Sequence, residues 1–261
     1  MTALEALAIL VAGFGAGMIN AIVGSGTLLT FPTLLWAGFA PVTANVSNTL
    51  GLVAGGVAGS WGYRHEVVGA GPTLKRLLPM SILGAASGAI LVIVLPPGVF
   101  EAAVPVLIGI GALLVVLGPR LQARMAQRRP DPIAASSRAG ATGPTLALMA
   151  GVLLAGVYGG YFGAAQGVIL IGLLSLLTTD ALQRINGYKN ILATAANFVG
   201  AITFLVIAPD QVVWSVVGLI AVGSLLGGLT GAAVGRRIPT TPLRVFILIV
   251  SVIAIVAFVA S

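Results

Sequence analysis

Long stretches without any charged residue constrain this chain more than any other feature. No charge occurs between Ala6 and Tyr63, between Leu77 and Phe100, or between Ala139 and Thr179. Two further gaps run from Val212 to Gly235 and from Val245 to Ser261. A helix needs about 20 apolar residues to cross a bilayer, and 7% charged residues are too few to cover a soluble surface. The sequence therefore predicts a multi-pass protein of the cell membrane.

Ten apolar segments are expected as helices. They cover about residues 4–23, 27–39, 43–63, 75–95, 100–118, 144–163, 167–178, 182–207, 211–235 and 242–260. The second and the seventh have only about 12–13 residues and reach only about 20 Å at 1.5 Å per residue, which is too short for a full span. Each of these two follows a glycine-rich break, so we expect each as a half-helix or as one arm of a bent hairpin.

Basic residues in the connections predict the orientation. The connection 119–143 carries five arginines against one aspartate, which is typical of a cytoplasmic loop. Further basic connections lie near 64–76, 184–189 and 236–244, whereas 95–101 and 208–211 carry no base. These assignments alternate along the chain and place both termini outside.

The two halves of the chain resemble each other at a shift of about 140 residues. GMINAIVGSGTLLTFPTLL from Gly17 resembles GVYGGYFGAAQGVILIGLL from Gly156, and NVSNTLGLVAGGVAG from Asn45 resembles GYKNILATAANFVGA from Gly187. Five segments per half would insert the second half upside down, an architecture known from transporters. We expect an all-α polytopic membrane protein with a first repeat at 1–118, a basic cytoplasmic linker at 119–143 and a second, inverted repeat at 144–261.

The same motifs resemble a known family. The run GFGAGMINAIVGSGTLLTFPTLLWAGFAPVTANVSNT is similar to the first repeat of the sulfite exporter TauE/SafE family, and the two stretches from Gly156 and Gly187 are similar to its second repeat. The resemblance implies a membrane transporter for sulfite, a sulfonate or another small sulfur-containing or organic anion. The chain departs from the family pattern at Gly-Ser-Gly-Thr in the first repeat and at Ala164, Ala165 and Gln166 in the second.

Residues at and near the two breaks are the candidates for substrate binding. Helix starts offer unpaired N–H groups to an anion, and hydroxyl, amide and ammonium groups add donors. The candidates are Gly24, Ser25, Gly26, Thr27, Asn48, Gly163, Gln166, Gly167, Lys189 and Asn190. Each has a structural alternative: close helix packing for the glycines, a helix–helix hydrogen bond or a cap for the amides, and snorkelling to the inner surface for Lys189. Asn45 is read as a cap of the third segment.

The function that these features favour is secondary transport of a small anion, with export as the favoured direction. The alternatives are an importer of a different organic solute on the same fold and a non-transporting scaffold subunit. No enzyme activity is expected, because the apolar segments hold no acid–base pair, nucleophile or metal cluster; no cofactor and no metal are expected either. The expected partners are the small anion and the lipid bilayer, without nucleic acid, and a homo-oligomer is left open.

Overall fold

The computed structural model describes residues 1–127, 144–235 and 240–260, and all regular structure in these ranges is helical. The helices are α1 (Ala3–Ile22), α2 (Thr27–Trp36), α3 (Pro41–Gly62), α4 (Gly71–Val94), α5 (Pro97–Gln127), α7 (Leu146–Tyr161), α8 (Gln166–Leu177), α9 (Leu182–Ile207), the short 3₁₀ helix η1 (Pro209–Gln211), α10 (Trp214–Val234) and α11 (Thr240–Ala260). Five described segments are long and apolar enough to cross a bilayer, namely α1, α4, residues 97–118 of α5, α9 and α10. The predicted all-helical membrane fold is confirmed, with the two short helices α2 and α8 at the predicted places.

One boundary differs from the expectation. Helix α5 continues to Gln127, nine residues into the stretch 119–143 that was predicted as a linker. The residues from Leu121 to Gln127 include Leu, Gln, Ala, Arg and Met, all good helix formers, so the helix continues after the apolar run has ended. Residues 128–143, with most of the predicted linker, lie outside the described part of the chain.

Small residues let helices of the two halves approach each other closely. Helix α1 packs on α10, and α4 packs on α7. A Cβ atom on Gly17 or Gly227 would overlap backbone atoms across the first pair, and one on Gly84 or Gly160 would overlap backbone atoms across the second. Close contact through small residues is a common way for membrane helices to associate. The halves are therefore interlocked, since each pair joins a helix of one half to a helix of the other.

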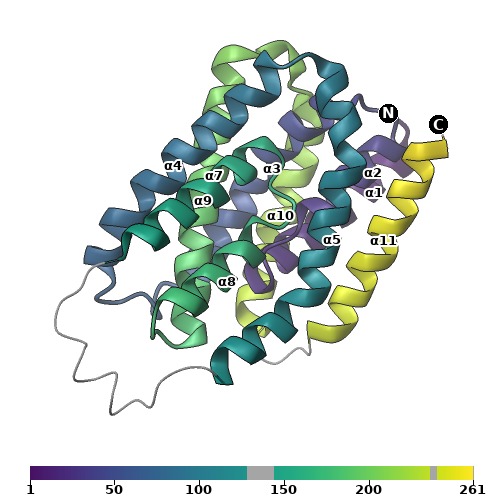
Figure 1. Cartoon of the computed structure of the whole chain (residues 1–261). Helices are drawn as coiled ribbons and strands as arrows, with labels where there is room; N and C mark the ends of the chain where they lie inside the picture. Colours follow the sequence, from purple (N-terminus) through teal and green to yellow (C-terminus); the bar gives the residue numbers. More distant parts are fainter. Residues whose placement is uncertain (128–143, 236–239, 261) are drawn as a thin grey trace.

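The packing pairs also correspond between the halves. The contact of α3 with α10 has its counterpart in that of α9 with α4, and the contact of α2 with α11 has its counterpart in that of α8 with α5. Figure 1 draws both chain ends at one end of the bundle and the end of α5 at the other, with α5 and α11 side by side. This arrangement is the one expected of two related halves, and their inverted insertion stays a prediction.

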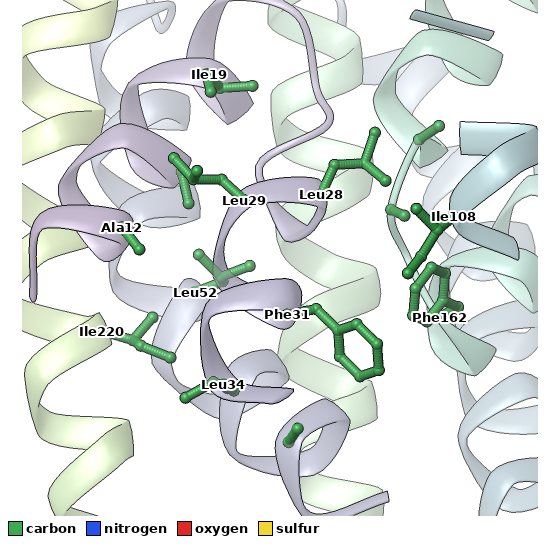
Figure 2. Packing of buried hydrophobic residues seen from close by; sticks show 14 of the residues in the cluster. Ala12, Ile19, Leu28, Leu29, Phe31, Leu34, Leu52, Ile108, Phe162 and Ile220 are labelled. Carbon is green, nitrogen blue, oxygen red and sulfur yellow. The ribbon is translucent and has the colours of Figure 1, made fainter. Parts of the chain in front are cut away.

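The core between the two short helices is aromatic. Phe31 on α2 packs edge-to-face on Phe162, with 5.0 Å between the ring centroids, and both rings contact Phe100 on α5. Figure 2 shows Phe31 beside Phe162 and Ile108. Edge-to-face pairs of this kind add about 0.5–1.5 kcal/mol beyond the burial of the rings. Because Phe162 directly precedes Gly163, this cluster joins α2 to the break of the second half.

Candidate substrate site at the two helix breaks

The first break begins where α1 ends at Ile22. The N–H groups of Val23 and Gly24 both donate to the carbonyl of Ile19, at 2.7 and 2.9 Å. Gly24 has a φ of +88°, a left-handed conformation that glycine adopts without steric cost and that commonly ends a helix. The chain then turns and starts α2 at Thr27.

The second break repeats this geometry 139 residues later. The N–H groups of Phe162 and Gly163 both donate to the carbonyl of Tyr158, at 2.9 and 3.0 Å, and Gly163 has a φ of +75°. Helix α8 then starts at Gln166, the position equivalent to Thr27. The glycine-rich stretches at the two related places of the sequence therefore form the same helix end and the same new start.

The two breaks touch each other. The N–H of Gly167 donates to the carbonyl of Gly24 at 3.1 Å, so the backbone of one break bonds to the backbone of the other. A Cβ atom on either glycine would overlap the Cα of the other. Both positions require glycine for this approach, and the contact brings the starts of α2 and α8 into one region inside the bundle.

A buried ammonium lies at this contact. Lys189 on α9 has no exposed surface, and its Nζ donates to the carbonyls of Asn20 and Ala21 at 2.7 and 3.0 Å. The Nδ2 of Asn190 donates to the same Ala21 carbonyl at 3.3 Å. These carbonyls belong to the last turn of α1, which leaves four carbonyls without helical partners and carries a partial negative charge. Snorkelling of Lys189 to the inner surface is not what the structure shows.

The stem of Lys189 also closes over the glycine contact. Its Cδ lies 3.1 Å from the place of a Cβ on Gly24 and 3.0 Å from the place of a Cβ on Gly167. Removing an ammonium from water costs several kcal/mol unless hydrogen bonds compensate. Two of the three N–H groups of Nζ have the carbonyl partners named above, and an ammonium can donate a third.

At the second break a neutral side chain of α3 bonds to the end of the helix before the break. The Nδ2 of Asn45 on α3 donates to the carbonyl of Tyr161, the last residue of α7, at 3.0 Å. The interpretation of Asn45 as a cap of its own helix is wrong, because α3 begins at Pro41 after Ala40 and Asn45 lies inside it. Sequence reasoning missed this cross-half contact; the signal was a polar residue within an apolar helix of the opposite half.

Several candidate residues hold α2 in place. Asn48 on α3 accepts a hydrogen bond from the Thr30 hydroxyl and donates from Nδ2 to Thr27 Oγ1 at 3.4 Å. The Gly26 N–H donates to Asn20 Oδ1 at 2.6 Å, and a Cβ on Gly26 would overlap the carbonyl of Ala16. Close packing, the structural alternative for this glycine, therefore explains Gly26.

Buried polar atoms without a hydrogen-bond partner lie at both breaks. Among the described residues they include Ser25 Oγ at the first break, and Gln166 Nε2 and Asn45 Oδ1 at the second. Ser25 and Gln166 are the two next to the contact between the breaks. Ser25 directly follows Gly24 and Gln166 directly precedes Gly167, so they flank the contact between the two breaks. The Gln166 side chain lies against Gly159, where a Cβ would overlap its amide. Buried polar groups without partners are costly and rare, and here both can donate to an acceptor oxygen.

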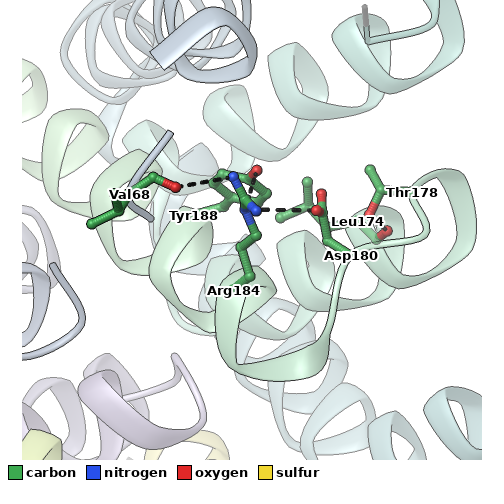
Figure 3. Close-up of polar contacts among 6 residues, drawn as sticks. All are labelled: Val68, Leu174, Thr178, Asp180, Arg184 and Tyr188. Carbon is green, nitrogen blue, oxygen red and sulfur yellow. Dashed lines mark hydrogen bonds and ion pairs between the residues drawn. The ribbon is translucent and has the colours of Figure 1, made fainter. Parts of the chain in front are cut away.

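Arg184 belongs to a separate group of residues at the start of α9. Figure 3 shows its guanidinium between Asp180, Tyr188 and Val68. Its Nε lies 3.6 Å from the Asp180 carboxylate and 3.0 Å from the Tyr188 hydroxyl, and Nη2 lies 3.3 Å from the Val68 carbonyl. Arg184 is partly exposed and ties α9 to the loop between α3 and α4, so it is a surface charge and no part of the breaks.

The fold and the breaks together define a class. Broken helices that start inside a bundle of membrane-length helices, with buried donors at their starts, are typical of membrane transporters. Within residues 1–127, 144–235 and 240–260 no group of three or more His, Asp or Glu side chains is placed to hold a metal ion. The sequence model of the family described as Sulfite exporter TauE/SafE matches residues 9–258, and the chain belongs to this family.

Related proteins carry the same class in their names. The chain is 28% identical over 238 residues to "Probable membrane transporter protein YfcA" of Escherichia coli strain K12, a match that covers 91% of this chain and 83% of the relative. It is 31% identical over 249 residues to "Probable membrane transporter protein ORF9" of Sinorhizobium sp, covering 93% and 87%. A "Probable membrane transporter protein" of Haemophilus influenzae is 26% identical over 242 residues, covering 92% and 88%. No solved structure gives a significant match.

These findings identify a multi-pass membrane transporter. The family and the relatives are named for transport and not for catalysis. The substrate, the direction of transport and the residues that bind the substrate go beyond the comparisons and are treated below as proposals.

Proposed function

We propose that the protein is a secondary transporter that exports a small anion, such as sulfite, a sulfonate or another sulfur-containing or organic anion. The carrying observation is the buried contact of the two breaks, where the stem of Lys189 packs on Gly24 and Gly167. The chain neighbours of these glycines, Ser25 and Gln166, hold donor groups without a protein partner. An oxyanion would supply acceptor oxygens to these groups and a counter-charge to the ammonium. The family description, which names sulfite export, supports the same substrate class.

The binding site in this proposal combines both halves. Ser25 comes from the first break, Gln166 from the second, and Lys189 from the helix that caps the first break from the other half. Asn190 orients the same cap, while Thr27 and Asn48 hold the start of α2. Gly24, Gly163 and Gly167 shape the backbone, and Gly26 packs α2 against α1. Alternating access would then move the halves around a site to which both contribute.

Export is proposed from the charge of the substrate. A cell interior is normally negative, so an anion gains about 2.3 kcal/mol per charge per 100 mV by leaving. The membrane potential alone can therefore drive the export of an anion, and no coupling ion is required to supply free energy. Of the described acidic residues, Glu66, Asp180 and Asp210 lie in loops or the short η1, Glu5 lies in the first turn of α1, and Glu101 is exposed near the start of α5. These positions at segment ends support a mechanism without a proton relay inside the membrane.

A flux assay with purified protein in proteoliposomes tests the proposal. Vesicles loaded in turn with sulfite, methanesulfonate, sulfate or a small carboxylate are held at a clamped potential without pH or sodium gradients. The proposal expects protein-dependent efflux of at least one anion that speeds up when the loaded side is negative. Efflux that ignores the potential and follows an imposed proton gradient would contradict uncoupled export, and absence of anion flux across the panel would contradict anion transport.

A further inference from the structure

The charge balance around the two breaks indicates which charge the substrate carries. Lys189 is the basic side chain at the contact, and its described hydrogen-bond partners are the neutral carbonyls of Asn20 and Ala21. A buried ion is stabilised when a counter-charge lies beside it, and destabilised when it is left with neutral partners alone. The substrate charge that this region stabilises most therefore depends on the charged side chains that lie around Lys189.

The elements packed on α9 are α1, α3, α4, α7, α8 and η1. Within their described residues the charged side chains are Glu5, Lys75, Arg76 and Asp210. Glu5 lies in the first turn of α1, about 24 Å of helix from the carbonyls that bind Lys189, and Asp210 follows the far end of α9, about 30 Å away along the helix. Lys75 and Arg76 are exposed in the first turns of α4 and have the same sign as Lys189.

The helix dipoles at the breaks do not change this balance. Each break sets the C-terminal end of one helix next to the N-terminal start of the next one, α1 before α2 and α7 before α8. A helix end carries roughly half a negative charge and a helix start roughly half a positive charge, so the two contributions largely cancel at each break. Two further charges lie near α9: Glu66 packs near Gly187, about 200° around the helix from Lys189, and Arg184 pairs with Asp180. Among the described side chains that contact the two breaks, Lys189 is the one that can carry a charge.

We infer that the site binds a small monoanion in preference to a dianion of the same shape, with Lys189 as the residue that determines this preference. The inference rests on the proposed anion transport and adds the charge of the substrate to it. One monoanion beside the ammonium leaves the buried region neutral, and the neutral donors of Ser25 and Gln166 bind its oxygens without adding charge. A dianion would leave one negative charge without a partner among the described residues of this region.

Two probes of nearly equal shape and different charge test the inference. Methanesulfonate and sulfate are both tetrahedral at sulfur and keep one and two negative charges at neutral pH. Their binding to the purified full chain in detergent is measured by titration calorimetry at matched ionic strength, with gluconate as the background anion. The inference expects methanesulfonate to bind at least about tenfold more tightly than sulfate, because only the monoanion is neutralised by one buried cation.

The variant Lys189→Gln, which keeps a donor amide and removes the charge, is compared with Arg184→Gln on the same helix. We expect Lys189→Gln to weaken methanesulfonate binding at least about tenfold and to narrow its advantage over sulfate to about threefold or less, whereas Arg184→Gln keeps the wild-type ratio. If Lys189→Gln fails to fold, the wild-type comparison decides by itself.

Equal or tighter binding of sulfate by the wild type would overturn the inference, as would an unchanged affinity and ratio in folded Lys189→Gln. Absence of binding of both probes would overturn it as well. In that case anion efflux in the proteoliposome assay would leave the proposed function standing, while absence of efflux would remove both.

Discussion

At the first break, the carbonyls that end α1 accept hydrogen bonds from the ammonium of Lys189, whereas at the second break the last carbonyl of α7 accepts one from the neutral amide of Asn45. Both breaks share a glycine with positive φ, two N–H groups on one carbonyl, and a new helix three residues later. The two breaks thus share these backbone features and differ in the side chain that donates to the carbonyls at the helix end. Both halves therefore contribute the same kind of helix break, whereas the basic side chain Lys189 bonds to the first break and the neutral side chain Asn45 to the second.

The largest effect is expected in a test of how the two halves are oriented in the membrane. If the halves are inverted, residues 119–143 lie in the cytoplasm and the turn at Asp210 lies outside, because the basic loops are cytoplasmic. The native chain has no cysteine, so Arg128→Cys, which lies outside the described residues, and Asp210→Cys each introduce one thiol. An impermeant thiol reagent is expected to label the Asp210→Cys variant in intact cells and the Arg128→Cys variant only after the membrane is opened.

Labelling of both variants from the same side would break the comparison, since the two breaks would then not be related by inversion. Labelling of the wild-type chain gives the background for both measurements.

The substitution Gly167→Ala, which adds one methyl group, tests the contact between the breaks. Gly167→Ala would place a Cβ into the Cα of Gly24, and overpacking of this kind costs about 1–3 kcal/mol. We expect a melting temperature in detergent lower by roughly 2–12 °C, since about 1 kcal/mol corresponds to about 2–4 °C for a chain of this size. Gly172→Ala is the matched control on the same helix, because nothing lies within 4 Å of its added Cβ.

Alanine is a better helix former than glycine by about 1 kcal/mol, so Gly172→Ala is expected to leave the melting temperature unchanged or to raise it. Equal melting temperatures for the two variants would show that the breaks are not in tight contact.

The neutral closure of the second break is tested by Asn45→Leu. This change leaves the Tyr161 carbonyl without its side-chain donor, and an unpaired buried polar group costs about 1–3 kcal/mol. We expect reduced thermal stability with an unchanged ratio of monoanion to dianion binding, because no charge is removed. If Asn45→Leu changed the ratio of monoanion to dianion binding as much as Lys189→Gln does, Asn45 and Lys189 would not differ in their effect on the charge preference.

The smallest effect on folding is expected for Ser25→Ala. The Ser25 hydroxyl is buried and bonds to no protein atom, so its removal should leave stability unchanged or raise it slightly. Loss of one hydrogen bond to the substrate should weaken anion binding by about 1 kcal/mol, or roughly fivefold. The control Ser81→Ala removes a buried hydroxyl that donates to the Leu192 carbonyl at 2.9 Å, and it should lower stability without this effect on binding.

Much of this arrangement was predictable from composition and spacing. The charge-free runs predicted helices, the glycine-rich stretches predicted where two of them break, and the shift of about 140 residues placed the second break. The end of α5 was not predictable from apolar runs, because the continuous apolar run has ended before residues 121–127 while these residues still favour a helix. The contact of Asn45 with Tyr161 was also hidden, because 116 residues separate the two and sequence periodicity reports the face of a residue and not its distant partner.

The central claim is that the ammonium at the first break, and not basic charge in general, serves the transported anion. Lys189→Met and Arg184→Met test it most directly, since both remove a cation from the same helix, one at the breaks and one in the surface cluster of Figure 3. Anion efflux from proteoliposomes is measured at a clamped potential, with equal amounts of protein that elutes as a single species on size exclusion. The account predicts at least about a tenfold loss of efflux for Lys189→Met, because the substrate loses its buried counter-charge, and efflux within about twofold of wild type for Arg184→Met, because surface ion pairs contribute little. Equal efflux in the two variants would contradict the account.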